Sequence, residues 1–316
     1  MQSLQNILVG LDLHHGDRIA SKQLEAASQG ALDQAVELAK ANGAAITLMA
    51  VLELSEQAVH LIEVDEENVY RTVEDVADTD LKVLAEQLTS QGLSITTKVV
   101  MGKGWEELTK QAIRGKHDLV VVGTRQRSST ARMLFGSTSN KLLRTCPVPV
   151  WVVKPGEIRE LREVMVATDF SEIGLQITQA GVAVAKNLNA KLFIAHALEF
   201  PFDSYLHTAG ISETEIASYR LRLRNEAQEK IHAQLSQTDY RTIEQGVRVE
   251  LHEGSPDAVI PKLIEEHEID VLVVGTHGRS GFSGMLLGNT VERLLPHVHC
   301  SLLVVKPANF VSPVRA

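Results

Sequence analysis

Three glycines near the end of the chain are spaced like a loop that binds phosphate. Gly275 follows a short apolar run, and Gly278 comes three residues later. Gly288 stands directly before Asn289, where a helix is expected to begin. Glycine lets the backbone approach a ligand closely, and the first turn of a helix offers unpaired N–H groups and a positive dipole end. Together with Asp169, whose carboxylate could accept hydrogen bonds from a ribose, this spacing indicates a nucleotide cradle. Plain turns account for the same glycines equally well.

The chain contains two copies of one unit. Residues 101–155 align without a gap on residues 253–307, and 19 of these 55 positions are identical. Both copies finish on the sequence VVKP, which begins at Val152 and at Val304. Upstream, NILVGLD from Asn6 matches EVMVATD from Glu163. The repeat indicates a tandem duplication, with domains at 1–156 and 157–307 and a tail at 308–316.

Each copy alternates short apolar runs with longer helical periods. In the second copy the expected strands cover 164–169, 191–198, 247–253, 270–276 and 301–306. The segments 171–188 and 255–267 have the spacing of amphipathic helices, with Ser171 and Ser255 as expected N-caps and Pro256 in a first turn. Strands that alternate with helices favour right-handed crossovers and a parallel sheet covered on both faces. The pattern therefore predicts two doubly wound α/β domains.

Composition limits the classes of partner. The 316 residues are 44% hydrophobic and 22% charged, which is typical of a folded globular chain. With 31 basic and 40 acidic residues the formal charge is −9, which opposes binding to nucleic acid or to an anionic membrane. The two cysteines, Cys146 and Cys300, are too few for a disulfide scaffold. The N-terminus lacks the features of a signal peptide, and no apolar run is long enough for a membrane helix. We therefore expect a cytoplasmic protein with no nucleic-acid or membrane partner.

Specific segments resemble the universal stress protein family. The segment VVGTHGRSGFSGMLLGNTVERLL from Val273, the following LLVVKP, and VMVATDFSE from Val164 are similar to the tandem-domain bacterial form of this family. The resemblance covers almost the full length of both copies. It implies two tandem Rossmann-like (HUP-type) domains that bind adenine nucleotides. Each would hold a five-stranded parallel sheet of order 3-2-1-4-5, with helices on both faces.

The resemblance implies a set of binding residues in the second copy. Ala167 and Asp169 would line the adenosine, and Ala197 would lie near the base. The family's Ser or Thr after the last glycine is Asn289 here, whose amide can still donate to a phosphate oxygen. The phosphate side would include the following residues: Val274, Gly275, Gly278, Arg279, Gly288, Asn289 and Thr290.

The first copy departs from the family pattern at another position. Its middle glycine is replaced by Gln126, whose side chain would crowd the path of the phosphates or strain the backbone. Three arginines on the same loop, at positions 125, 127 and 132, form either an anion site or a solvated basic loop. The equivalent binding residues are Gly10, Asp12, Val51, Val122, Gly123, Gly136 and Ser137.

The resemblance implies a stress-response factor that senses ATP or AMP, with or without Mg²⁺, and acts through a protein partner. The alternatives are a slow nucleotide hydrolase and a binder of a nucleotide sugar or a lipid-like anion. Common hydrolase and metalloprotease motifs are missing, so an enzyme is not expected, although weak ATPase activity is compatible with the cradle. A permanent metal is also not expected at His297, His299 and Cys300, or at 14–17.

The resemblance also bears on assembly. It implies that the two halves pair through their last strands as an intramolecular pseudo-dimer, and a homodimer of the whole chain is a further option. The second copy also carries about six extra residues that include Phe200, Phe202 and Tyr205. These aromatic residues are expected to form a local core or a lid over the cleft.

Overall fold

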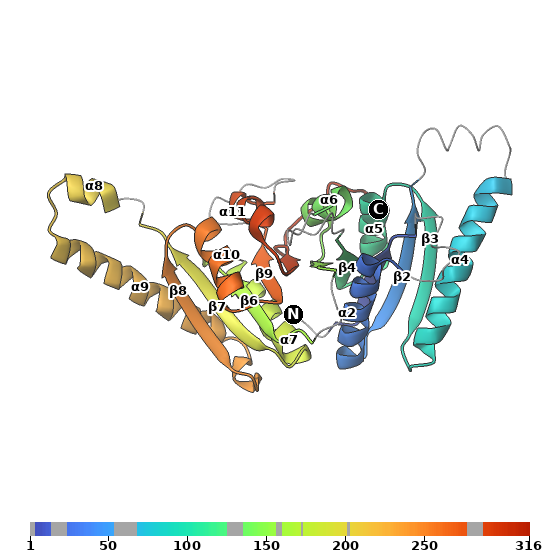
Figure 1. Ribbon diagram of the computed structural model, residues 1–316, viewed down its shortest axis with the longest axis horizontal. Helices are drawn as coiled ribbons and strands as arrows, with labels where there is room; N and C mark the ends of the chain where they lie inside the picture. Colours follow the sequence, from blue (N-terminus) through green and yellow to red (C-terminus); the bar gives the residue numbers. More distant parts are fainter. Residues whose placement is uncertain are drawn as a thin grey trace. The chain divides into compact units, whose positions relative to one another are not determined.

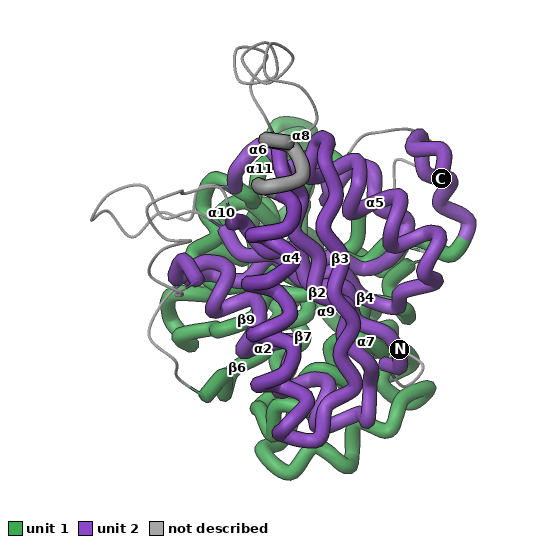
Figure 2. The backbone as a smooth tube through the Cα atoms, turned by 90° about the vertical axis from the view of Figure 1, so that its right-hand side faces the viewer, with its two compact units in different colours: residues 1, 160–308 green, residues 2–159, 309–316 purple. Residues whose placement is uncertain are grey.

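The computed structural model describes residues 4–13, 24–53, 68–124, 135–155, 160–171, 173–200, 203–276 and 287–316. Its internal contacts divide the chain into two units, which Figure 2 distinguishes by colour. The first domain comprises Gln2–Arg159 together with the tail Asn309–Ala316, and the second comprises Glu160–Ala308. The tail at the end of the second copy therefore belongs to the first domain.

The first domain is a five-stranded parallel sheet of order β3-β2-β1-β4-β5. In chain order its elements are β1 (Asn6–Leu11), α2 (Ala26–Asn42), β2 (Ala45–Leu52), α4 (Asn68–Thr89), β3 (Ile95–Met101), α5 (Gly104–Arg114), β4 (Leu119–Gly123), α6 (Ser137–Thr145) and β5 (Val150–Val153). Figure 1 shows this succession of strands and helices.

The second domain repeats the arrangement with the order β8-β7-β6-β9-β10, again with every pair parallel. Its elements are β6 (Glu163–Ala167), α7 (Gly174–Asn187), β7 (Lys191–Leu198), α8 (Asp203–Thr208), α9 (Glu213–Leu235), η1 (Tyr240–Thr242), β8 (Val247–Glu253), α10 (Pro256–Glu266), β9 (Val271–Gly275), α11 (Asn289–Leu294), η2 (Leu295–His297) and β10 (Ser301–Val305).

Helices cover both faces of each sheet. In the second domain α7 and α9 contact each other and the sheet on one side, while α10 and α11 form a second contacting pair. In the first domain α2 and α4 pack on the strands, and α5 and α6 contact each other. The central strands are buried on both sides, as Leu8, Val120, Met165 and Leu272 illustrate with no exposed surface. The predicted α/β class with a parallel sheet is therefore confirmed.

One aspartate fixes the start of each sheet in the same way. Asp118 Oδ2 accepts the backbone N–H groups of Gln5 and Asn6, at 2.8 and 2.9 Å. Asp270 Oδ2 accepts those of Arg162 and Glu163, at 2.7 and 3.0 Å. Each carboxylate precedes the fourth strand and holds the beginning of the first strand beside it. The duplication thus preserves a tertiary contact as well as a sequence pattern.

The expected N-cap at Ser171 is wrong. Helix α7 begins at Gly174 with Ile173 as its N-cap residue. The Ser171 N–H donates to Asp169 Oδ1 at 3.0 Å, which places Ser171 in a turn before the helix. Ser255 does occupy the N-cap position of α10, directly before Pro256, but its side chain makes no capping hydrogen bond.

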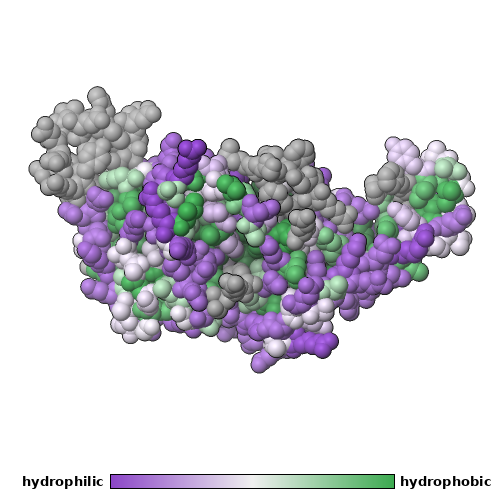
Figure 3. All heavy atoms as spheres, turned by 180° about the vertical axis from the view of Figure 1, so that it is seen from behind, coloured by the Kyte–Doolittle hydropathy of each residue, from purple (hydrophilic) through white to green (hydrophobic). Residues whose placement is uncertain are grey.

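Tyr205, one of the aromatic residues of the second-copy insertion, does not belong to a local core. Tyr205 in α8 is 73% exposed. The Arg220 guanidinium lies 5.5 Å from the centre of the Phe200 ring, and Phe202 lies outside the described residues. Figure 3 shows hydrophobic residues gathered at α8 and the beginning of α9, next to a mostly hydrophilic stretch of α9. Among the described helices, none is both long and apolar enough to cross a membrane.

Candidate functional site

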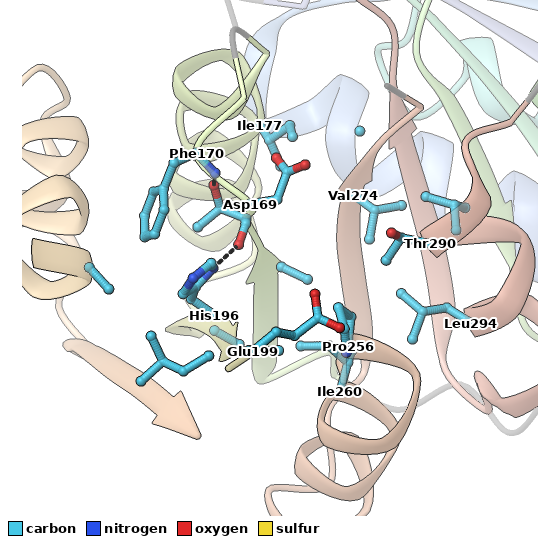
Figure 4. A pocket seen from close by; sticks show the side chains of 18 of the residues that line it. Asp169, Phe170, Ile177, His196, Glu199, Pro256, Ile260, Val274, Thr290 and Leu294 are labelled. Carbon is cyan, nitrogen blue, oxygen red and sulfur yellow. Dashed lines mark hydrogen bonds between the residues drawn. The ribbon is translucent and has the colours of Figure 1, made fainter. Parts of the chain in front are cut away.

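A cavity of about 450 Å³ lies at the carboxyl ends of β6, β7 and β9 in the second domain. Its volume falls within the range of small-molecule sites, and its place at the strand ends is where open parallel sheets bind ligands. Figure 4 shows side chains from both sides of the sheet converging on it. Gly278 and Arg279 lie outside the described residues. The cavity is lined by the other eight residues predicted for this copy: Ala167, Asp169, Ala197, Val274, Gly275, Gly288, Asn289 and Thr290.

The turn after β6 shapes one wall of this cavity. Phe170 adopts a left-handed backbone conformation with φ of 60°, which is uncommon for a residue with a side chain. Its N–H donates to Thr168 Oγ1 at 3.3 Å, next to the bond between Ser171 and Asp169. The Phe170 ring lies 4.3 Å from the ring of His196, centre to centre, and His196 Nδ1 donates to the Thr168 carbonyl at 2.7 Å. These contacts hold the aromatic pair against the cavity.

Helix α9 supplies a wall that the sequence did not predict. Leu223, Glu226, Ala227 and Lys230 all line the cavity, and Lys230 Nζ lies 5.6 Å from the centre of the Phe170 ring. These positions recur at helical spacing but carry no motif, and α9 has little amphipathic period, so no sequence signal indicated this wall. Thr168, Phe170 and His196 were missed as well.

Helices α10 and α11 close the opposite side. Pro256 and Ile260 come from the first turns of α10, and Val291 and Leu294 come from α11. The two helices contact each other, and Arg293 Nη2 lies 3.8 Å from Asp257 Oδ1 across this contact. At the equivalent positions in the first domain, Lys141 Nζ lies 5.3 Å from the centre of the Trp105 ring.

The structure shows a second reason why glycine stands at the end of the fourth strand in each domain. A Cβ on Gly275 would lie 2.6 Å from Ile177 Cδ1, and a Cβ on Gly123 would lie 2.0 Å from the Ala27 carbonyl oxygen. Both distances are shorter than atoms tolerate. These two glycines therefore make room for the helix that packs across the strand end, in addition to lining a cavity.

The first domain has a smaller cavity of about 250 Å³ at the matching place. Gln126 and the three arginines beside it lie outside the described residues. Met49 and Val51 stand where the second domain has Ala195 and Ala197, and within the described part of the chain α4 contributes no lining residue. The larger side chains at these two positions reduce the space in the smaller cavity. The cavity is nevertheless lined by all seven residues predicted for this copy: Gly10, Asp12, Val51, Val122, Gly123, Gly136 and Ser137.

A buried carboxylate holds the edge strand next to the larger cavity. Glu250 is 6% exposed and stands beside Ala195 in the pairing of β8 with β7. His252 Nε2 lies 2.8 Å from its Oε2, while Arg248 Nε and His267 Nε2 lie 2.5 and 3.2 Å from its Oε1. Burial acts to raise the pKa of the Glu250 carboxyl, but the hydrogen bond from His252 and the nearby positive charges outweigh burial and lower this pKa.

The chemistry of the larger cavity suits binding. Asp169, Glu199 and Glu226 bring carboxylates from three elements, whereas Asn289 and Thr290 bring an amide and a hydroxyl. Carboxylates accept hydrogen bonds from hydroxyl or amino groups, and amides and hydroxyls can donate to an anion. Across the residues that the structure describes, no three His, Cys, Asp or Glu side chains are grouped so as to hold a metal ion.

Comparisons with known proteins show which family the chain belongs to. The universal stress protein family matches residues 4–154 and 160–306. Universal stress protein E of Photorhabdus laumondii is 27% identical over 329 residues, which cover 100% of this chain and 99% of that protein. Universal stress protein E of Escherichia coli K12 is 27% identical over 326 residues, with coverage of 100% and 98%. A solved universal stress protein from Archaeoglobus fulgidus shares the fold, with a TM-score of 0.62, 18% identity and coverage of 97% and 99%. The chain therefore belongs to the universal stress protein family and carries two of its domains in tandem.

Proposed function

We propose that the second domain binds an adenine nucleotide, ATP or AMP, and that the protein acts as a nucleotide sensor in a stress response. The observation that carries this proposal is the cavity of about 450 Å³, which gathers eight residues from separate parts of the chain that the family resemblance had assigned to one ligand. These residues lie far apart in the sequence, and the fold brings the ends of β6, β7 and β9 together with the beginning of α11. A shared cavity is the arrangement that one ligand requires.

The chemistry of the lining residues suggests how the nucleotide lies. Asp169 would accept hydrogen bonds from the ribose hydroxyls, and the small Ala197 side chain leaves space for the base. Asn289 and Thr290 would donate to the phosphate oxygens, with Gly278 and Arg279 completing the phosphate side. Any Mg²⁺ would accompany the phosphates as part of the ligand.

The first domain offers a weaker nucleotide site in this proposal. Its cavity is about 250 Å³, and Met49 and Val51 narrow the part that would hold the base. We expect it to bind the same nucleotide more weakly, or to stay empty at concentrations that fill the second domain.

Helix α9 connects the cavity to the surface of the second domain, so it could make the presence of a ligand detectable to a partner. Its residues Leu223 and Lys230 line the cavity, while Leu221 on the same helix is 58% exposed. A ligand that contacts α9 favours the conformations of this helix that suit it. A partner protein that binds the surface of α9 would then distinguish the occupied from the empty protein.

Two measurements test nucleotide binding. Small molecules released from freshly purified protein by denaturation are identified by mass spectrometry, and ATP and AMP are titrated into the emptied protein by calorimetry. Ala197→Leu fills the expected base position and should weaken binding by at least about tenfold, because the added atoms need space that the ligand occupies. Ala233→Leu, on an exposed position of α9, is the matched control and should bind as the native chain does. Unchanged affinity in Ala197→Leu would contradict the site.

The apolar part of the cavity favours a second candidate, an anionic ligand with an apolar group, such as a nucleotide sugar or a lipid-like anion. Leu198, Leu223, Ile260 and Leu294 line the cavity and provide such a surface. The same mass spectrometry separates the two candidates, because an amphipathic molecule in the released fraction, with no adenine nucleotide, would replace the first proposal with the second.

A further inference from the structure

The two cavities share an acidic residue at the end of the second strand of each domain. Glu53 follows β2 and Glu199 follows β7, and each stands two residues after the residue expected beside the base, Val51 or Ala197. Side chains two residues apart leave the same face of a strand. Both glutamates line their cavities. Met49 and Val51 of the first copy correspond to Ala195 and Ala197 of the second, whereas the glutamate and the leucine before it recur.

The acidic side of the larger cavity is built from neighbouring strand ends. Strands β6 and β7 pair in parallel, so Asp169 and Glu199, which follow them, lie at the same edge of the sheet. Asp169 Oδ1 accepts the Ser171 N–H, which ties this carboxylate to its turn. Figure 4 shows Glu199 extending into the cavity from the strand end, across from Thr290 and Leu294.

The opposite wall differs in chemistry. Gly288, Asn289 and Thr290 line the larger cavity there, and Gly136, Ser137 and Thr138 line the smaller one. Hydroxyl and amide groups can donate hydrogen bonds to an anion, whereas a carboxylate can only accept them. Each cavity therefore has an accepting end and a donating end. A ligand with N–H groups at one end and an anionic group at the other matches this polarity.

We infer that Glu199 recognises an exocyclic amino group on the base of the nucleotide and is a specificity-determining residue. The inference rests on the proposed function. An aminopurine directs the N–H groups of its 6-amino group toward the carboxylate. A 6-oxopurine places a carbonyl oxygen at the same position, so the carboxylate faces another acceptor there and only the neighbouring N1–H can still donate to it. Glu199 is exposed, so the discrimination arises when the bound base covers the carboxylate and a base without the amino group leaves it poorly paired. Glu53 has the same role in the smaller cavity.

ATP and ITP are the matched probes, since the 6-amino group of one is a 6-oxo group in the other. Calorimetry on the full chain should show that the native protein binds ATP at least about tenfold more tightly than ITP. Glu199→Gln should bind the two nucleotides within about threefold of each other, because a glutamine amide can accept from an amino group or donate to a carbonyl. Thermal unfolding of each variant checks that the fold is intact.

Two further variants locate the effect. Glu229→Gln removes the same charge from an exposed position of α9 outside the cavity and should keep the native preference. Glu226→Gln changes a second carboxylate of the cavity, and a preference lost in Glu226→Gln but kept in Glu199→Gln would overturn the inference and move the recognition to α9. A native preference that survives Glu199→Gln, or equal native affinities for ATP and ITP, would overturn the inference and leave nucleotide binding intact. Native protein that binds neither nucleotide would overturn the proposed function along with it.

Discussion

At the scale of single residues, the same glycine in the two copies has different neighbours. A Cβ on Gly123 would meet backbone atoms of Ala27, which can move only with the start of α2. A Cβ on Gly275 would meet the ends of the Ile177 and Ile173 side chains, which can rotate. The two positions therefore differ in how much added volume they tolerate.

This difference gives a paired prediction. Gly123→Ala should lower the free energy of unfolding by about 2–3 kcal/mol, and Gly275→Ala by about 1 kcal/mol, since overpacking against backbone is harder to relieve than overpacking against a side chain. Urea unfolding of the two variants measures both losses. Equal losses would contradict the packing argument.

Glu163 gives a prediction whose sign depends on pH. Burial raises the pKa of its carboxyl, the neighbouring Asp270 charge adds to this, and Lys191 and His267 oppose it. Because this pKa is higher in the folded state than in the unfolded state, the ionised carboxylate destabilises the folded state at a pH above the folded-state pKa. The destabilisation disappears as the pH falls below the pKa of the unfolded state, about 4.3. Glu163→Gln should therefore raise stability at pH 7 by less than about 1 kcal/mol and leave it unchanged at pH 3. Thermal unfolding at the two pH values, with the exposed Glu160→Gln as control, tests this; a stability loss at pH 7 would contradict it.

The residues that sequence alone could assign are those held by local rules. Asp169 and Gly275 stand at the ends of apolar strands, and a parallel sheet brings such ends to one edge. The left-handed Phe170 and the contact between Lys230 and Phe170 could not be predicted in this way. They depend on which face of α9 packs against the sheet, and this packing is set by tertiary contacts that no short sequence motif indicates.

At the scale of elements, edge strand β8 is held by charge as well as by its ladder with β7. Glu250 joins Arg248 and His252 of the strand to His267, which caps the C-terminus of α10 and stacks on Phe193 at 4.7 Å between ring centres. One carboxylate thus connects β8 to the helix whose first turn lines the cavity.

The boundaries of the strands in the second copy were predictable from sequence to within a residue or two, because both faces of each central strand are buried and the apolar runs are continuous. This charged cluster was not predictable, because its members are spread over 20 residues.

Glu250→Gln tests the cluster. The pKa of the Glu250 carboxyl is lowered in the folded state, so its contribution is present above the unfolded value of about 4.3 and is lost as the pH falls through the folded value. At pH 7 the substitution should cost about 1–2 kcal/mol, because it removes the charge that accepts the hydrogen bond from His252 and pairs with Arg248, two partners that are themselves partly exposed. The difference from the native chain should shrink toward zero in acid. Urea unfolding across this pH range measures it, and a constant difference would show that shape, not charge, holds the strand.

At the scale of the whole molecule, the last eight residues return from the second copy to the first domain. Ser312 Oγ donates to the carbonyl of Thr145 at 2.7 Å, and the Val314 N–H donates to Ser312 Oγ at 3.1 Å. Thr145 ends α6, and Ser137, which begins that helix, lines the smaller cavity. The tail therefore satisfies a carbonyl at the end of α6 that the helix itself leaves without a partner. The apolar sequence of the tail carried no indication of where it docks.

Removal of residues 309–316 should therefore loosen α6 and leave the second domain unchanged. One hydrogen bond of this kind contributes about 0.5–1.5 kcal/mol, which corresponds to roughly two- to tenfold faster amide exchange where local opening governs exchange. Hydrogen exchange with mass spectrometry should show this acceleration in peptides covering Ser137–Thr145, while peptides covering Pro256–Glu266 exchange as before. Ser312→Ala should give a partial effect, and Val311→Ser, at a position 86% exposed, should give none. If amide exchange in α6 is as slow in the truncated chain as in the native chain, the tail lies on the first domain without stabilising α6. If exchange becomes faster in α10 as well as in α6, the tail stabilises the chain as one cooperative unit and not α6 alone.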